Sequence, residues 1–303
     1  MPEGRFRRFL LALGAALAGA LLATPAAQAG LLFPEAGGSP NADSIKTLYI
    51  MVFVLALFIF AGVEGTLLYS LFKYRARKGR QAAQIHGNTK LEIGWTVGAA
   101  VILVFITAFT FIKLNDIKDP KPSLIDENGN PIAQVDNLQT ASTDLKSIKG
   151  PQMRITVNGQ QYVWRYKYPG DDNLLVYSDM VVPVGMTVIL DIEADDVAHS
   201  WWIPKLGGKM DALPGYTNKT WFRIPLDAIP EGQDRVIYTG QCAELCGRNH
   251  ANMYARVIGM RMPDYKRWYA QQVEALKQAK TDVATQQEKL TESQESAGQD
   301  TGQ

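Results

Sequence analysis

The sequence predicts a two-helix transmembrane hairpin followed by an all-β domain outside the membrane. Two observations lead to this fold class. Two long apolar runs, Leu48–Phe72 and Ile93–Ile112, are each about as long as a bilayer-spanning helix requires. Between residues 151 and 262 the chain holds short runs of β-branched and aromatic residues, separated by Gly, Pro, Asn and Asp. That pattern is typical of a β sandwich or barrel.

The chain begins with a segment that has the three parts of a secretory signal peptide. Arg5, Arg7 and Arg8 make a basic start, an apolar stretch extends over Leu10–Ala23, and Ala27-Gln28-Ala29 matches a cleavage site. We therefore expect residues 1–29 to be removed during export. An uncleaved anchor helix is the alternative, and it would also direct the rest of the chain to the membrane or across it.

Residues 30–115 are expected to form an N-terminal segment and the hairpin, with spans at 48–72 and 93–112. The intervening loop, 73–92, opens with the basic sequence KYRARKGR, which the positive-inside rule places in the cytoplasm. The start of the first span and the end of the second then lie on the extracytoplasmic side of the membrane, in agreement with an exported N-terminus. We expect a multi-pass protein of the bacterial plasma membrane whose remaining chain is extracytoplasmic.

The exported part divides by composition. Residues 116–150 are rich in Asp, Asn, Pro, Ser and Lys and predict a linker, and residues 151–262 are expected to be the β domain. Residues 263–303 are expected to begin as a helix and to end, beyond Gln278, as a frayed helix and a disordered tail. The near-zero net charge gives no basic field that would indicate nucleic-acid binding.

One loop of the β domain concentrates soft metal ligands. The sequence CAELCGRNHANM carries Cys242, Cys246, His250 and Met253, including both cysteines of the chain. Thiolate, imidazole and thioether groups suit copper and are wrong for magnesium or calcium. A second histidine, His199, comes after a predicted strand and meets this loop only if the two strand ends are neighbours.

Several chemistries remain open for these residues. A disulfide is the simplest alternative for two cysteines outside the cytoplasm, but it leaves the histidines and the methionine unexplained. A mononuclear blue-copper site needs only one cysteine, and a structural zinc site leaves the thioether idle. Two coppers bridged by both thiolates would use every soft ligand.

Three segments, DVAHSW, LGGKMDALPG and GQCAELCG, resemble sequence blocks of subunit II of the haem–copper cytochrome c oxidases. The resemblance to this family covers roughly residues 30 to 262. It implies a cupredoxin fold, a Greek-key β barrel, with a dinuclear CuA centre of two coppers per chain. The implied ligands are His199, Cys242, Glu244, Cys246, His250 and Met253. Glu244 would give its backbone carbonyl to copper and its carboxylate to a magnesium shared with subunit I.

The resemblance also implies two functional positions elsewhere. NTKLEIGWT resembles the start of the second span, where Glu92 would lie at the cytoplasmic mouth of a proton-conducting path; a solvated interfacial carboxylate is the alternative. NGQQYVWRYKY resembles the aromatic segment where electrons enter from cytochrome c. Trp164 matches the second tryptophan of that segment, whereas Tyr162 replaces the first. Core or edge-strand packing is the alternative for both aromatic residues.

The expected function is that of subunit II of a proton-pumping cytochrome c oxidase. The chain would accept electrons from cytochrome c, or a complex carrying cytochrome c, and pass them to haem held only by subunit I, where oxygen becomes water. Subunit III is a further expected partner. The sequence has no C-x-x-C-H motif, which excludes covalent haem c in this chain.

Three rival functions remain. One is the CuA-bearing subunit of a nitric-oxide or nitrous-oxide reductase. Another is a copper-free subunit II of a quinol oxidase, and the third is a membrane-anchored copper chaperone.

Overall fold

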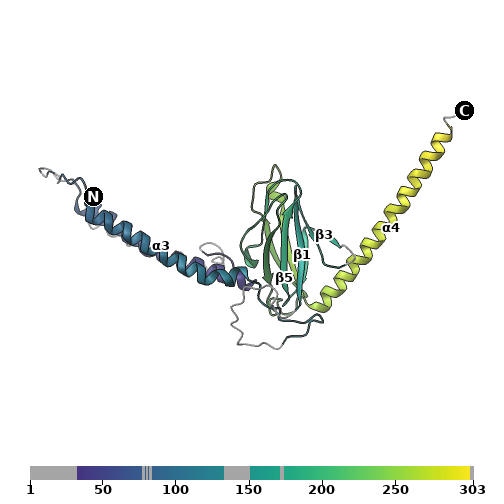
Figure 1. The fold of residues 1–303 in the computed structure, drawn as a ribbon, viewed down its shortest axis with the longest axis horizontal. Helices are drawn as coiled ribbons and strands as arrows, with labels where there is room; N and C mark the ends of the chain where they lie inside the picture. The colour runs from purple at the N-terminus through teal and green to yellow at the C-terminus, as the bar shows by residue number, and fades with distance from the viewer. Residues whose placement is uncertain are drawn as a thin grey trace. The chain divides into compact units, whose positions relative to one another are not determined.

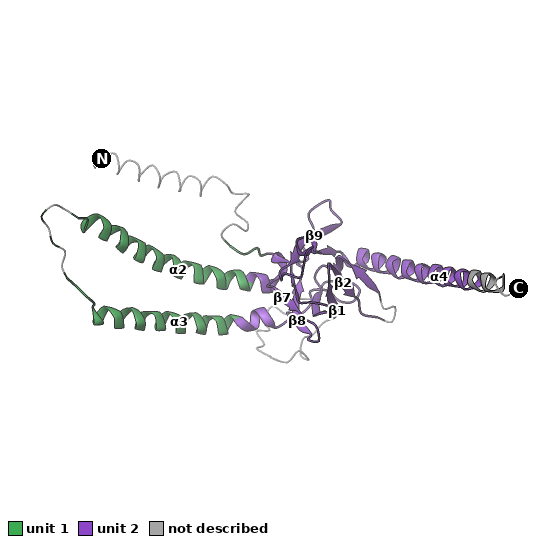
Figure 2. Ribbon diagram, turned by 90° about the horizontal axis from the view of Figure 1, so that it is seen from above, with its two compact units in different colours: residues 1–36, 44–113 green, residues 37–43, 114–303 purple. Residues whose placement is uncertain are grey.

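The computed structural model describes residues 33–76, 79, 81, 84–132, 151–170 and 174–300. The chain forms two compact units, of which the first comprises residues 1–36 and 44–113 and the second residues 37–43 and 114–303 (Figure 2). The predicted signal peptide, part of the basic loop and most of the predicted linker lie outside the described residues.

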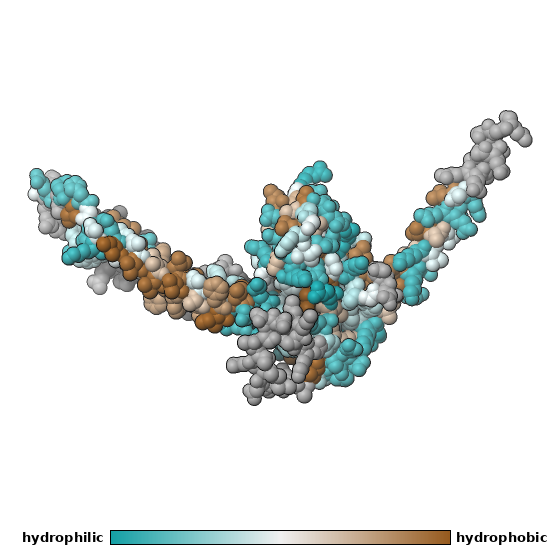
Figure 3. Space-filling view, viewed as in Figure 1, coloured by the Kyte–Doolittle hydropathy of each residue, from teal (hydrophilic) through white to brown (hydrophobic). Residues whose placement is uncertain are grey.

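The first unit consists mainly of two long apolar helices, α2 (Pro40–Lys73) and α3 (Thr89–Lys118). Each contains an 18-residue window of mean hydropathy 2.3, of which 0% is buried. Apolar side chains therefore cover the helical surface (Figure 3). Both helices are long and apolar enough to cross a membrane, and both extend beyond the predicted spans. Pro40 begins α2, where its fixed φ suits the first helical turn.

The second unit contains an all-β domain of two five-stranded sheets (Figure 1). One sheet has the order β3-β2-β1-β5-β8, and the other has the order β4-β10-β9-β6-β7. The elements are β1 (Gln152–Gln160), β2 (Val163–Lys167), β3 (Leu175–Tyr177), β4 (Asp179–Pro183), β5 (Thr187–Ala194), β6 (His199–Trp202), η2 (Pro204–Leu206), β7 (Met210–Ala212), β8 (Asn218–Arg223), β9 (Arg235–Cys242), η3 (His250–Asn252) and β10 (Tyr254–Met260).

Two strand pairs in these sheets are parallel, β1 with β5 and β4 with β10, while the other pairs are antiparallel. Parallel neighbours require a crossover connection, so the domain is not a simple meander. The predicted fold class, an all-β domain of the cupredoxin kind preceded by a two-helix hairpin, is confirmed.

One hydrophobic core lies between the two sheets. Val188, Leu190 and Ile192 point into it from alternate positions of β5, and Ala255 and Val257 reach it from β10; all five are 0% exposed. Alternation of this kind results from the two-residue period of a strand. The packed sheets form a rigid frame for the loops at their ends.

The described part of the predicted linker, residues 116–132, packs against the β domain. α3 continues to Lys118, and the turn after it buries Ile125, which is 2% exposed and belongs to the core. Ser123 accepts the N–H of Thr187 at 2.8 Å and so ties the segment to β5. Ile125 and the hydrogen bond to Ser123 anchor this stretch, although its composition is mostly polar.

The C-terminal helix α4 (Met262–Asp300) also continues further than the sequence predicted. Its first turns bury Tyr265 and Val273, as the helical spacing indicated. Beyond Gln278, where a frayed helix and a disordered tail were expected, the backbone remains helical to Asp300. Ala, Gln, Glu and Lys dominate this stretch, and their high helix propensity accounts for the difference.

Candidate metal centre

His199 lies beside the cysteine loop because β6 pairs with β9. Trp201 is opposite Cys242 in this antiparallel pair, and Trp202 is opposite Gln241. The sequence placed His199 only after the end of a predicted strand, which is β5; it is the first residue of β6, in the other sheet. Four residues between two turns were too short a run to be identified as a strand. The pairing of β6 with β9 therefore places His199 beside the cysteine loop, which is the condition that the sequence set for His199 to join the site.

The segment from Cys242 to Met253 closes on itself. The N–H of Cys242 donates to the carbonyl oxygen of Met253 at 2.9 Å, and the N–H of Met253 donates to that of His250 at 3.1 Å. The N–H of Ala243 reaches the carbonyl of Ser200 at 2.9 Å and ties the loop to β6. Both ends of the loop are therefore held by main-chain hydrogen bonds.

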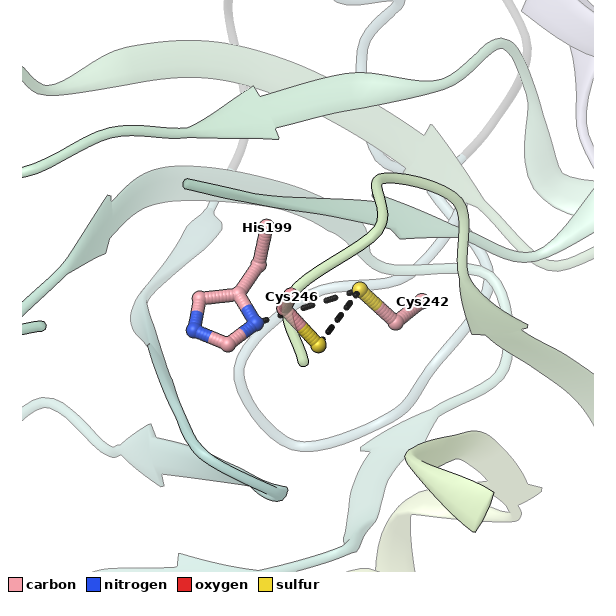
Figure 4. A group of neighbouring side chains, drawn as sticks. All are labelled: His199, Cys242 and Cys246. Carbon is pink, nitrogen blue, oxygen red and sulfur yellow. Dashed lines mark hydrogen bonds between the residues drawn. The ribbon is translucent and has the colours of Figure 1, made fainter. Parts of the chain in front are cut away.

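Four side chains of this region turn toward one another. The Sγ atoms of Cys242 and Cys246 are 3.9 Å apart, and both cysteines are free thiols. Nδ1 of His199 lies 3.9 Å from Sγ of Cys242, and Figure 4 shows these three side chains converging. Nδ1 of His250 lies 3.5 Å from Sγ of Cys246. Each thiol thus has one imidazole beside it.

Two weaker donors complete the group. Sδ of Met253 lies 3.9 Å from Sγ of Cys246, and the carbonyl oxygen of Glu244 lies 3.2 Å from Sγ of Cys242. The carboxylate of Glu244 belongs to an exposed residue. We call these six groups the donor cluster, and its members are His199, Cys242, the carbonyl of Glu244, Cys246, His250 and Met253.

The donor cluster is largely shielded from water. His199, Cys242, Cys246 and Met253 are between 0% and 4% exposed. Burial, with a further contribution from the neighbouring Cys242, raises the pKa of the Cys246 thiol to about 11. That thiol is therefore neutral near pH 7 until a cation displaces its proton.

Asp196 orients His199. Its Oδ1 lies 2.8 Å from Nε2 of His199, and its carboxylate also accepts the N–H groups of Gln161 and Val197. Burial opposes ionisation of Asp196, but these hydrogen bonds outweigh it and lower the pKa of the carboxyl group. With Nε2–H donated to Asp196, the Nδ1 lone pair faces Cys242, which is the arrangement of a carboxylate–histidine–metal site.

No motif in the sequence identifies this aspartate as a partner of His199. The signal that would have identified it is its position, three residues before a candidate ligand in the same turn.

The donor set fits copper. Two thiols, two imidazoles and a thioether form a soft set, and copper in its two common oxidation states accepts all three donor types. Zinc would be satisfied by the thiols and imidazoles alone. It would leave the buried thioether of Met253, 3.9 Å from a thiol, without a role. The structure brings the predicted copper ligands together, and no predicted ligand lies elsewhere.

The aromatic pair of the predicted electron entry lies next to the donor cluster. Trp164 of β2 is 0% exposed, and its ring centroid is 5.9 Å from that of His199 at an interplanar angle of 66°. Tyr162 is half-buried and packs against the core. Of the two aromatic residues, only Tyr162 reaches the surface of the domain.

Glu92 belongs to the other unit. It lies in the first turn of α3, is exposed, and accepts the N–H of Asn88 at 3.3 Å. Asn88 in turn accepts the N–H of Leu91 at 3.2 Å. These reciprocal bonds resemble a capping box, which satisfies main-chain donors at a helix start. The carboxylate therefore has a structural task in addition to the predicted proton role.

Two family profiles match the chain. The profile described as cytochrome c oxidase subunit II, periplasmic domain, matches residues 170–259. The profile described as cytochrome c oxidase subunit II, transmembrane domain, matches residues 26–112.

Individual proteins show the same similarity. A cytochrome c oxidase subunit 2 of Cereibacter sphaeroides is 30% identical over 284 residues, covering 78% of this chain and 81% of that protein. One of Alkalihalophilus pseudofirmus is 31% identical over 233 residues, covering 76% of this chain and 58% of that protein. A crystal structure of the periplasmic domain of subunit II from Bradyrhizobium japonicum is 29% identical, covering 42% of this chain and 94% of that chain, with a TM-score of 0.36.

Proposed function

This chain belongs to the cytochrome c oxidase subunit II family, and from that premise we propose that it is the electron-accepting subunit of a haem–copper terminal oxidase. The observation that carries the proposal is the donor cluster. All six groups required for a dinuclear copper centre lie close together, and four of its five side chains, those of His199, Cys242, Cys246 and Met253, are nearly inaccessible to water.

The arrangement of the cluster supports a division of roles among the ligands. The two thiols lie between the two imidazoles, with His199 beside Cys242 and His250 beside Cys246. Cys242 and Cys246 would each be shared by two coppers, and each histidine would serve one of them. Met253 and the carbonyl of Glu244 would be weak ligands that tune the potential.

Bound in this cluster, the copper pair would supply one-electron transfer between cytochrome c and the haem of subunit I. The chain's own part is to hold the donors still and to exclude water. Asp196 fixes the ring of His199, and the main-chain bonds of the loop fix Cys242 and Met253. A site that changes little between oxidation states favours fast electron transfer, because little has to be rearranged.

Other residues would link the copper domain to its partners. The exposed carboxylate of Glu244 is available for a magnesium ion shared with subunit I, since its carbonyl, not its carboxylate, faces the cluster. Tyr162, half-buried beside the cluster, would receive electrons from cytochrome c, with Trp164 behind it. Glu92 at the start of α3 would feed protons to subunit I.

The hairpin would anchor the protein in a bacterial plasma membrane. α2 and α3 have the length and hydropathy of membrane spans. The basic sequence that begins at Lys73 favours a cytoplasmic loop, and the copper domain would then lie on the extracytoplasmic side. Subunit I, and with it subunit III, would be the membrane partners.

The copper-bearing subunit of a nitric-oxide or nitrous-oxide reductase is the second candidate, because a similar copper loop would serve there. The match of the transmembrane profile favours the oxidase. A copper-free quinol-oxidase subunit would have no need for six convergent donors. A chaperone that delivers copper would present exposed ligands, whereas the cysteines and the methionine of this cluster are at most 4% exposed.

The test is a metal count with an electron paramagnetic resonance spectrum of the full-length chain, purified in detergent with any haem-bearing partner. We expect two coppers per chain, one unpaired electron shared equally between them, and oxygen consumption with reduced cytochrome c. Cys246→Ser should abolish the shared-electron spectrum. One copper per chain, or an unchanged spectrum in Cys246→Ser, would refute the proposal.

A further inference from the structure

The turn between β1 and β2 reaches the cysteine loop. β1 ends at Gln160, which pairs with Val163 at the start of β2, so Gln161 and Tyr162 form the turn. The side-chain amide of Gln161 donates from Nε2 to the carbonyl oxygen of Cys246 at 2.6 Å. The two residues are 85 positions apart in sequence; Gln161 follows β1 of one sheet, and Cys246 lies in the loop after β9 of the other.

The main chain of the same residue reaches the other side of the cluster. The N–H of Gln161 donates to Oδ2 of Asp196 at 2.7 Å. The other oxygen of this carboxylate lies 2.8 Å from Nε2 of His199. One residue therefore contacts the loop that carries Cys246 and the carboxylate that orients His199.

We propose that Gln161 is a positioning residue for the metal centre, which fixes Cys246 and His199 relative to each other. The proposal rests on the proposed function and deepens it. β6 and β9 already hold His199 against Cys242 through strand pairing. Cys246 lies beyond the end of β9, where no strand partner holds it, and Gln161 supplies the missing attachment.

The conformation of Gly247 supports this role. Its φ is +129°, a region that side-chain-bearing residues rarely adopt. A Cβ atom at this position would lie 2.6 Å from the hydroxyl oxygen of Tyr162 and 2.8 Å from Nε2 of Gln161. The loop thus has a glycine at the place where the turn approaches, and the amide of Gln161 reaches the neighbouring carbonyl because no side chain intervenes.

Gln160 provides a matched control. It is the preceding glutamine, and its Nε2 donates to Oδ2 of Asp195 at 2.8 Å. Asp195 also bonds Asn158 and Arg165, and the hydrogen bonds described for it do not reach a member of the donor cluster. Gln160→Leu and Gln161→Leu each remove one side-chain hydrogen bond from the same β hairpin, but only the second bond holds a candidate ligand.

The first measurement uses the metal-free full-length chain in detergent, so it does not depend on copper binding. The alkylation rate of Cys246 is monitored by mass spectrometry. One net hydrogen bond contributes about 1 kcal/mol, which corresponds to a roughly five-fold change in an opening equilibrium. We expect alkylation about five-fold faster in Gln161→Leu and close to the wild-type rate in Gln160→Leu, with equal thermal midpoints for the two variants.

The second measurement uses the copper-loaded chain. Gln161→Leu should release copper to a chelator about ten-fold faster and alter the thiolate-to-copper absorption, as loss of an outer-shell partner typically does. Wild-type rates and spectra in Gln161→Leu would overturn the inference, as would equal effects in both variants. A wild-type chain that binds no copper would refute the proposed function, while the alkylation rates would still decide whether Gln161 holds Cys246.

Discussion

Gly247→Ala is the substitution that most directly tests how closely the β1–β2 turn approaches the cysteine loop. Alanine adds one Cβ atom at a φ of +129°. That atom would lie 2.6 Å from the hydroxyl oxygen of Tyr162 and 2.8 Å from Nε2 of Gln161. Real Cβ atoms do not tolerate such distances, so the side chains of Tyr162 and Gln161, or the loop itself, have to move.

The expected destabilisation has two parts. A side-chain-bearing residue held in this backbone region costs about 1 to 3 kcal/mol. Displacing the amide of Gln161 from the carbonyl of Cys246 costs about 1 kcal/mol more. The free energy of unfolding should therefore fall by about 2 to 4 kcal/mol. For a β domain of about 110 residues, this corresponds to a thermal midpoint lowered by roughly 8 to 16 °C.

Gly215→Ala is a control for the effect of a side chain at a positive φ. Gly215 also has a positive φ, +75°, but a Cβ atom built there has no neighbour within 4 Å. This control keeps a backbone cost of about 1 kcal/mol without the close contact. Thermal unfolding of the metal-free full-length chain, measured by near-ultraviolet circular dichroism in detergent, compares both variants with the wild type. Equal midpoints for the two variants would show that the turn does not press on the loop.

Three other measurements test the structure. Tyr168→Phe should lower the free energy of unfolding by about 1 to 3 kcal/mol in denaturant titrations, because the buried hydroxyl accepts the N–H of Val181 and donates to its carbonyl; an unchanged titration midpoint would contradict this. Asp196→Asn should weaken copper binding about 10- to 100-fold in chelator competition, since His199 loses its charged partner; wild-type affinity would exclude the orienting role. The metal-free chain should lose stability from about pH 9 to pH 11. Folding raises the pKa of the Cys246 thiol from 9 to about 11, so in this range the folded chain holds a proton that the unfolded chain releases. Cys246→Ser should remove this part of the pH dependence.

The donor cluster could be predicted because its information lies in residue type. Cysteine, histidine and methionine at Cys242, Cys246, His250 and Met253 carry the same chemistry whatever surrounds them, and their close spacing ensures that they meet. His199 was identified by type, but its location required the pairing of β6 with β9. A four-residue strand has too few positions to show alternation, so its register could not be read from the residues alone.

The residues that orient the ligands could not be predicted in the same way. Asp196 and Gln161 are ordinary polar residues, and their roles depend on contacts between segments distant in sequence. Gln160 and Gln161 are chemically identical neighbours, yet their side chains have different partners. Only the path of the β hairpin distinguishes them. The C-terminal helix was predicted, but its continuation beyond Gln278 was not, because the polar composition of that stretch also suits a disordered tail.

The two sheets contribute different parts of the metal centre. The sheet that contains β6 and β9 supplies His199 and Cys242, and the loop that continues from β9 supplies the remaining donors. The other sheet supplies the orienting groups, with Gln161 in the β1–β2 turn and Asp196 just after β5. Because Gln161 and Asp196 belong to the sheet opposite the donors, the packing of one sheet on the other contributes to how the ligands are held. A core substitution that shifts the sheets by a few tenths of an ångström should therefore alter the copper spectrum, although it touches no ligand.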